Sequence, residues 1–427
     1  MAFRLQSWAG NAGWAVLDYA LFALAGMIAN VLLARSLPAE SYGAYAVSFA
    51  VYLVVFVVHS ALFAEPMLVL AAQRFREQTG AYLRLLLRAH GLFSLVLLAL
   101  AGLCAVVDVG DARVRHALWY MALAAPFMNL VQLLRRVCYG LWSTRSAALG
   151  AAAYLVLLTA TLAALQAAGL LGLGSGYAAL GGISLLVSAG FWWRLRRGTD
   201  GATAPSFAEV VQAHLSFARY GVGTALLGWV PQNVWYLVLP LVLRGPEQLG
   251  PSGHLRALVN LVQPMLQVNG ALGTLLVPTF ARQPNESPWR FTGLMTALSA
   301  LYAPVLVGLG PWANQLLYRG AYPSDTATWC TLGALPACFA FYTSLRSYCV
   351  ARERPKLPLW ATMFAAVASL TLGVGLCAWQ PLQGSALAML LGFALQAACM
   401  AWLVRRQKGS GEMVVANRPA AALKRRS

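Results

Sequence analysis

Acidic residues are scarce in this chain of 427 residues, which has 13 Asp+Glu against 31 Lys+Arg and only 10% charged residues in all. A soluble globular protein has about 25% charged residues. The basic excess gives a formal net charge of +18, but a water-soluble nucleic-acid binder would need far more polar surface. The hydrophobic fraction of 60% also excludes intrinsic disorder. The composition therefore indicates a polytopic membrane protein whose basic residues flank its spans.

Signatures of catalysis are missing as well. The seven cysteines include no CxxC pair, and they lie mostly in apolar stretches, which favours buried thiols over a disulfide framework. No Gly-Lys-Ser/Thr phosphate loop is present, so we expect no ATP hydrolysis by this chain. No His, Cys and Asp cluster has metal-ligand spacing. We expect neither a cofactor nor a metal, and we do not expect an enzyme.

Long apolar runs recur along the whole chain. A helix needs about 20 residues to cross the hydrocarbon. The first run lacks a clear small-x-small cleavage site, so we interpret it as a retained span. The sequence thus predicts an all-α polytopic membrane protein with twelve transmembrane helices, at residues 12–33, 44–71, 85–107, 116–134, 146–171, 176–193, 218–243, 254–281, 291–317, 326–350, 357–379 and 382–404.

The basic residues orient these spans. With the N-terminus in the cytoplasm, 25 basic residues fall in cytoplasmic segments, and the outer segments hold the other six: Arg35, Arg113, Arg115, Arg244, Arg256 and Arg319. A bias of this size follows the positive-inside rule. It predicts an even number of spans with both termini in the cytoplasm.

A polar stretch in the middle divides the chain into two similar halves. We expect an N-terminal six-helix lobe at 1–197, a cytoplasmic linker at 198–217, a C-terminal six-helix lobe at 218–407 and a basic flexible tail at 408–427. The tail would be attracted to anionic lipids. Gly43 and Gly253 follow the first outer loop of their halves, and six spans per half give both halves the same orientation. This predicts a parallel repeat about an axis along the membrane normal.

Two short segments carry a resemblance to a known family. Leu32–Tyr45 reads LLARSLPAESYGAY, and Gln315–Tyr322 reads QLLYRGAY. With six plus six spans and short outer loops, the chain resembles the polysaccharide flippases of the multidrug/oligosaccharidyl-lipid/polysaccharide exporter superfamily. Ala39 separates Pro38 from Glu40, which is a small departure from the family's pattern.

The resemblance implies two six-helix lobes around a central cavity that opens alternately to each face. It also implies a polyprenyl-diphosphate-linked oligosaccharide as cargo, moved across a bacterial inner membrane for surface polysaccharide synthesis. The partners would be this lipid-linked oligosaccharide, membrane lipids and the polysaccharide polymerase machinery. We expect a monomer and no nucleic-acid partner.

Polar side chains inside spans indicate where cargo would bind, because they are costly in lipid. The eighth span carries Arg256, Asn260, Gln263 and Gln267 on one helical face. One interpretation is a cavity stripe, in which Arg256 binds diphosphate and the amides bind sugar hydroxyls. The alternative is helix packing, with Arg256 snorkelling to the interface.

Two other spans combine amides with an aromatic or a basic residue. They contribute Trp229, Gln232, Asn233 and Tyr236 in the seventh span, and Asn129, Gln132 and Arg136 in the fourth. An aromatic ring flanked by amides suits a sugar, but an ordinary helix kinked at Pro231 would also contain these residues. For Arg136 and its neighbour Arg135 the alternative is the positive-inside rule itself.

Asp18 and Glu65 lie in the inner halves of the first two spans. They are candidates for coupling to a proton or cation, because a desolvated carboxylate can titrate near neutral pH. The alternatives are a structural salt bridge to an inner arginine such as Arg136 and, for Glu65, a wet and unwound helix end. His59 is more typical of a hydrogen-bonded interior histidine than of a proton carrier.

Three functions follow from these residues. The leading hypothesis is a lipid-linked oligosaccharide flippase. The second is a cation-coupled drug exporter of the same superfamily, which would use Asp18 and Glu65. The third is a membrane-embedded polysaccharide polymerase or ligase, which usually needs a large outer loop, whereas the outer loops here are about 5–15 residues long.

Overall fold

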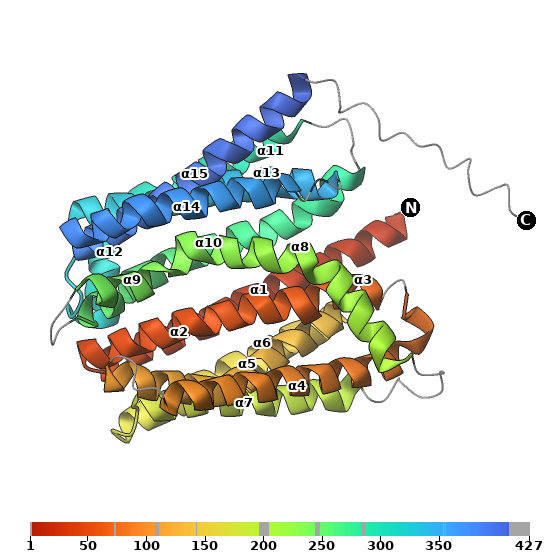
Figure 1. Cartoon of the computed structure of the whole chain (residues 1–427), viewed down its shortest axis with the longest axis horizontal. Helices are drawn as coiled ribbons and strands as arrows, with labels where there is room; N and C mark the ends of the chain where they lie inside the picture. The colour runs from red at the N-terminus through yellow and green to blue at the C-terminus, as the bar shows by residue number, and fades with distance from the viewer. Residues whose placement is uncertain are drawn as a thin grey trace, which may run out of the picture.

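The computed structural model describes residues 2–71, 74–106, 111–141, 143–195, 205–243, 248–282, 287–352, 354 and 356–409. Within these residues every regular element is a helix, and the helices run roughly side by side in a bundle (Figure 1). The predicted all-α polytopic membrane class is therefore confirmed.

The helices follow the predicted spans in order. The first half contains α1 (Ala2–Ser36), α2 (Ala39–His59), the π-helical turn η1 (Ser60–Ala64), α3 (Glu65–Leu70), the 3-10 turn η2 (Arg76–Gln78), α4 (Thr79–Val106), α5 (Ala112–Gly140), α6 (Thr144–Ala167) and α7 (Leu173–Leu195). The second half contains α8 (Phe207–Asn233), α9 (Trp235–Val242), α10 (Gly250–Arg282), α11 (Pro288–Ala300), α12 (Tyr302–Tyr318), α13 (Thr326–Ala351), α14 (Lys356–Trp379) and α15 (Pro381–Gly409).

Nine segments of the described chain are long and apolar enough to cross a membrane, and the bent pair α8–α9 makes a tenth. The remaining two of the twelve predicted spans correspond to α10 and α13, which are 33 and 26 residues long. Neither passes the same test of apolarity, and α10 carries the polar stripe.

Part of the expected linker at 198–217 is helical, and its residues 198–204 lie outside the described part. Ser206 caps α8 by accepting a hydrogen bond from the Glu209 backbone N–H at 3.1 Å, so the helix begins at Phe207 and residues 207–217 are helical. Polar residues there belong to a helical extension of the span. The tail is also shorter than expected at its start, since α15 continues to Gly409 and residues 410–427 lie outside the described part.

Helices of the same half pack against one another. In the first half α1 packs on α6 and α5 on α7, and in the second half α14 packs on α15 and α10 on α13. Small residues allow close approach of the backbones. A Cβ on Gly181 would lie 3.1 Å from the Cα of Ala124, and one on Gly333 would lie 3.0 Å from the Cα of Ala303.

The two halves contact each other mainly through α1 and α2 of the first half and α10 of the second. The first part of α8 also crosses to the N-terminal half, where it packs on η1, α3 and α4 (Figure 1). We call the end of the bundle where α1 ends and α2 begins the outer end, following the expected topology. The chain enters α1 and leaves α15 at the opposite, inner end (Figure 1).

Candidate functional site

The turn between α1 and α2 presents two opposite charges to helix ends of the other half. The Arg35 guanidinium donates to the backbone carbonyls of Leu316 and Leu317 in the last turn of α12. Those carbonyls have no partner within their helix and carry the negative end of its dipole. A cation from the N-terminal half therefore caps a helix of the C-terminal half.

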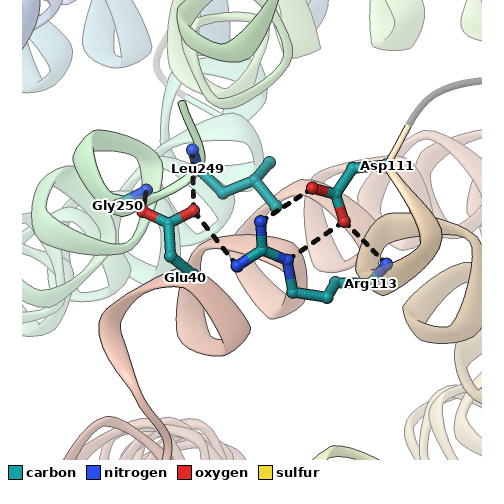
Figure 2. Close-up of polar contacts among 5 residues, drawn as sticks. All are labelled: Glu40, Asp111, Arg113, Leu249 and Gly250. Atoms are coloured by element: carbon teal, nitrogen blue, oxygen red, sulfur yellow. Dashed lines mark hydrogen bonds and ion pairs between the residues drawn. The ribbon is translucent and has the colours of Figure 1, made fainter. Parts of the chain in front are cut away.

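Glu40 makes the complementary contact at the start of α10 (Figure 2). Its carboxylate accepts hydrogen bonds from the backbone N–H groups of Leu249 at 3.1 Å and Gly250 at 2.9 Å. Arg113 lies between two acids, 3.7 Å from Glu40 and 2.8 Å from Asp111. The hydrogen bonds from Arg113 hold the pKa of the Asp111 carboxyl below its ordinary value. The positive end of α10 is thus matched by an anion.

The two repeat-related glycines meet beside these contacts. A Cβ on Gly43 would overlap the Leu249 carbonyl, and one on Gly253 would lie 2.9 Å from the backbone nitrogen of Gly43. The Tyr322 hydroxyl also donates to the Ala34 carbonyl at 3.1 Å. We call the contacts of Arg35, Glu40, the two glycines and Tyr322 across the two halves the outer seam. They join the two sequence segments that carry the family resemblance.

Arg256 lies one turn beyond Gly253 on α10 and is only 7% exposed. Its Nε donates to the Asn30 side-chain oxygen at 3.2 Å, and its guanidinium lies 4.6 Å from the Phe49 ring and 5.8 Å from the Tyr236 ring. None of the ion pairs among the described residues involves Arg256. The side chain is enclosed between the halves and does not extend to the outer surface, so snorkelling does not describe it.

The rest of the stripe becomes more exposed toward the inner end. Asn260 is 3% exposed and donates to the Tyr318 hydroxyl at 3.0 Å and the Met27 carbonyl at 3.4 Å. Gln263 is half-buried and Gln267 is exposed. The stripe therefore runs from the contact between the two halves to an exposed part of the α10 surface.

The seventh-span residues separate into two groups. Trp229 and Tyr236 are buried; the Trp229 indole donates to the Ala50 carbonyl on α2 at 3.1 Å, and Tyr236 faces Arg256. Gln232 and Asn233 are half-buried, and Asn233 donates to the Trp229 carbonyl of its own helix at 3.4 Å. Of these four residues, Tyr236 joins the group around Arg256.

The fourth-span residues lie apart from Arg256. Asn129 is 1% exposed, and neither amide atom has a hydrogen-bond partner in the described chain. Gln132 accepts from Arg135 at 2.7 Å, and Arg136 lies 5.4 Å from the Tyr19 ring. Tyr19 and Asn30, the α1 neighbours of Arg136 and Arg256, are about 16 Å apart along a helix. Arg136 therefore lies in an inner group, separate from the outer group around Arg256.

Asp18 forms the structural salt bridge that was one alternative for it. The carboxylate is fully buried and accepts from Arg135 at 2.7 and 3.0 Å and from the Tyr139 hydroxyl. The suggested partner Arg136 is wrong: Arg135 makes the ion pair with Asp18, and Arg136 lies instead against the ring of the neighbouring Tyr19. Glu65 is exposed at the start of α3.

Sequence reasoning missed the partners that complete these groups. Asn30 was detectable, because it is an amide inside an apolar span, whereas nothing in the spacing links it to Arg256. The same holds for His90, which lies 31 residues from its partner His59. Long-range pairings of this kind depend on how the helices pack.

No family model and no curated protein matches this sequence. Solved structures do match. One is titled an inward-facing conformation of a multidrug resistance MATE family transporter of the MOP superfamily, with 12% identity, a TM-score of 0.74, and coverage of 94% of this chain and 100% of that one. Another is the lipid II flippase MurJ in an inward closed conformation, with 13% identity, a TM-score of 0.70, and coverage of 92% and 87%.

A third is a mutant of the Vibrio cholerae MATE transporter VcmN, with 12% identity, a TM-score of 0.63, and coverage of 96% and 99%. These similar structures are transporters and a flippase, not enzymes. The chain therefore has the fold of the MOP superfamily of transporters, the multidrug/oligosaccharidyl-lipid/polysaccharide exporter superfamily that its sequence resembles.

Proposed function

We propose that this protein is a MOP superfamily flippase that moves a polyprenyl-diphosphate-linked oligosaccharide across the bacterial inner membrane by alternating access. The observation that carries the proposal is Arg256, a buried cation that pairs with no carboxylate in the described chain. Burying an unpaired charge is costly, and one amide and two rings offset only part of that cost. An anionic diphosphate would supply the missing counter-charge.

The outer seam is suited to opening and closing. It consists of hydrogen bonds to helix ends and of backbone packing at Gly43 and Gly253, beside a ring contact between Tyr42 and Tyr322. A typical hydrogen bond contributes about 1 kcal/mol net, because water replaces it when it breaks. Opening the seam would expose Arg256 to the outer side, while the polyprenyl tail stays in the bilayer.

The polar stripe on α10 could bind successive parts of the cargo. Arg256 and Asn260 lie at the contact between the halves, and Gln263 and Gln267 are progressively more accessible toward the inner end. Amides bind sugar hydroxyls, and a guanidinium binds phosphate in a bidentate manner. The glycan would therefore meet the amides first and the diphosphate would reach Arg256 last. Downstream, the polymerase machinery would receive the repeat unit.

A cation-coupled drug exporter is the second candidate, because one of the structures with this fold is titled a multidrug resistance transporter. Such a protein needs an available acid. Asp18 is held by two hydrogen bonds from Arg135, so its use for ion coupling would require breaking that pair. Resistance to lipophilic cationic drugs on expression, without any effect on surface polysaccharide, would favour this candidate.

The flippase proposal is tested by Arg256→Ala, with Arg290→Ala as the matched control, since Arg290 is an exposed arginine at the inner start of α11. We expect Arg256→Ala to lower surface polysaccharide more than tenfold and to accumulate lipid-linked repeat units, at unchanged membrane abundance. Arg290→Ala should behave as wild type. Normal polymer from Arg256→Ala would refute the assigned role of this residue.

A further inference from the structure

Two tyrosine hydroxyls beside Arg256 are buried without a partner. Tyr42 on α2 is fully buried, and Tyr236 on α9 is 1% exposed. Neither hydroxyl has a hydrogen-bond partner among the described residues. Both tyrosines interact electrostatically with the Arg256 guanidinium, whose carbon lies 5.8 Å from the centre of the Tyr236 ring. A buried hydroxyl without a partner has lost its hydrogen bonds to water, so it lowers stability and requires an explanation.

Other tyrosines of the bundle show the usual, satisfied state. The Tyr302 hydroxyl donates to the Leu261 carbonyl at 2.6 Å, and the Tyr177 hydroxyl lies 2.7 Å from the Ser48 hydroxyl. Tyr42 and Tyr236 are the tyrosines whose buried hydroxyls lack a partner within the described residues. Both exceptions therefore occur at the same place, next to the arginine that has no ion pair.

The group around Arg256 also has more donors than acceptors. A guanidinium offers five N–H donors and no acceptor, and the hydrogen bond from Nε to the Asn30 oxygen uses one of them. The Tyr318 hydroxyl accepts from Asn260 at 3.0 Å and keeps its own hydrogen for donation. The ion pairs of the described chain bring no carboxylate to this group. What the group lacks is an anion with several acceptor oxygens.

Packing fixes the positions of the two unpartnered tyrosines. The Tyr42 ring stacks on the Tyr45 ring at 5.8 Å and contacts the Tyr322 ring at the same distance. On the other side, the Ser252 hydroxyl donates to the Tyr236 carbonyl at 3.1 Å, which ties α9 to the start of α10. Donors that are held in place before a ligand arrives bind it more tightly, because less conformational freedom is lost on binding.

We propose that the Tyr42 and Tyr236 hydroxyls bind the diphosphate of the cargo together with Arg256, and that they lower the stability of the protein in its absence. This proposal rests on the flippase function proposed above and adds two residues to its binding site. Each O–H donates to a phosphate oxygen, and no covalent bond changes. A hydrogen bond to a charged oxygen is stronger than one between neutral groups, so the bound anion offsets the cost of burying the two hydroxyls.

The two hydroxyls come from different halves of the molecule. Tyr42 precedes Gly43 at the outer seam, whereas Tyr236 and Arg256 belong to the second half. A diphosphate bound by all three residues therefore bridges the halves and favours the conformation in which the seam is closed. Opening the seam separates α2 from α10 and withdraws the Tyr42 hydroxyl. The loss of this donor weakens binding at the step in which the cargo leaves toward the outer side.

The first test is the stability of Tyr42→Phe and Tyr236→Phe without ligand, because each change removes only the hydroxyl. We expect both variants to melt at or above the temperature of the wild type, since a buried group without a partner is lost. The matched control is Tyr302→Phe, which loses a hydroxyl that donates to a carbonyl. This control should melt at a lower temperature. Thermal unfolding of the purified proteins in detergent measures all three variants.

The second test is the affinity for inorganic diphosphate, which carries the chemistry of the headgroup without lipid or sugar. The dissociation constant is obtained from the rise of the melting temperature with diphosphate concentration. We expect it to be about tenfold weaker in Tyr42→Phe and Tyr236→Phe than in the wild type. The constant should be unchanged in Tyr302→Phe. In cells, the first two variants should accumulate lipid-linked repeat units, which distinguishes a lipid-borne diphosphate from a free one.

Three results would overturn the proposal. These are a lower melting temperature of Tyr42→Phe and Tyr236→Phe without ligand, a diphosphate affinity that both variants retain, and a wild type that does not respond to diphosphate. The flippase function is decided separately. Loss of export in Arg256→Ala with normal binding and export in both phenylalanine variants would leave the flippase standing and refute the role of the hydroxyls.

Discussion

At the scale of single residues, the charges inside the bundle differ in whether they are paired. Asp18 and Arg135 satisfy each other, and the Arg135 guanidinium also lies 3.9 Å from the Phe22 ring. Arg256 has an amide and aromatic rings as neighbours, and no ion pair among the described residues includes it. A paired charge stabilises one arrangement, whereas an unpaired one is available to an anionic ligand. This difference separates a structural arginine from a candidate binding residue.

Removing one partner of the Asp18–Arg135 pair should be strongly destabilising. Arg135→Gln leaves a fully buried carboxylate without its counter-charge, which costs about 3–5 kcal/mol. The double variant Asp18→Asn/Arg135→Gln removes both charges and should recover most of the loss. Thermal unfolding of the purified variants in detergent measures both effects. Equal stability of the single and double variants would show that the pair does not hold α1 and α5 together.

The sequence predicted these residues better than it predicted their partners. It identified Asp18 as a candidate for a salt bridge to an inner arginine, but two adjacent arginines were available and only helix rotation distinguishes them. It placed Arg256 at the head of a polar stripe because the i, i+4, i+7 spacing is local. Asn30 and Phe49 complete the Arg256 site across the two halves, and no local pattern contains that contact.

At the scale of elements, the outer seam depends on backbone contact between α2 and α10. The two glycines in this crossing were visible as a repeat in the sequence, but only packing shows that they touch. The same holds for Arg35, whose partner Leu317 is 282 residues away. The segments that resemble the known family are thus explained by one physical role, which is closure of the outer end.

A side chain at Gly43 should force the seam apart. In Gly43→Val the new Cβ would overlap the Leu249 carbonyl, which is backbone and cannot rotate away. Reagents that label cysteine from outside should then reach a cysteine placed at Asn260, which is 3% exposed in the closed form. Gly182→Val is the control, because nothing lies within 4 Å of a Cβ at that position. Similar labelling in both variants would contradict the role of this crossing.

The charged contacts of the seam should be individually weak. Glu40→Gln keeps a side chain of similar size but removes the negative charge from the start of α10, where a charge contributes about 0.3–1 kcal/mol. We expect a two- to fivefold increase in the rate of labelling at residue 260, with unchanged thermal stability. No change in that rate would mean that the packing of Gly43 and Gly253 alone holds the seam.

At the scale of the whole molecule, hydrophobic length and charge bias predicted the order of spans well. The helices follow that order, and even α10 and α13, which are less apolar, correspond to predicted spans. The helical state of residues 207–217 was not predicted, because polar composition does not distinguish a loop from a helix that extends into water. Only the N-cap at Ser206 locates the start of α8.

The membrane topology of the two termini can be tested with reporter fusions. The basic residues predict that both termini lie in the cytoplasm, and in the structure α1 begins and α15 ends at the same end of the bundle (Figure 1). A green fluorescent protein fused after Ser427 should therefore fluoresce, and alkaline phosphatase fused there should be inactive. The reverse pattern would invert the outer and inner ends and assign the seam to the cytoplasmic side.

The central claim is that the molecule moves a lipid-linked oligosaccharide, and its most direct measurement is the leaflet distribution of that lipid in cells depleted of the protein. We predict that lipid-linked repeat units accumulate on the cytoplasmic leaflet, that wild-type protein restores them to the outer leaflet, and that Arg256→Ala does not. An unchanged distribution of these lipids between the two leaflets on depletion would contradict the account.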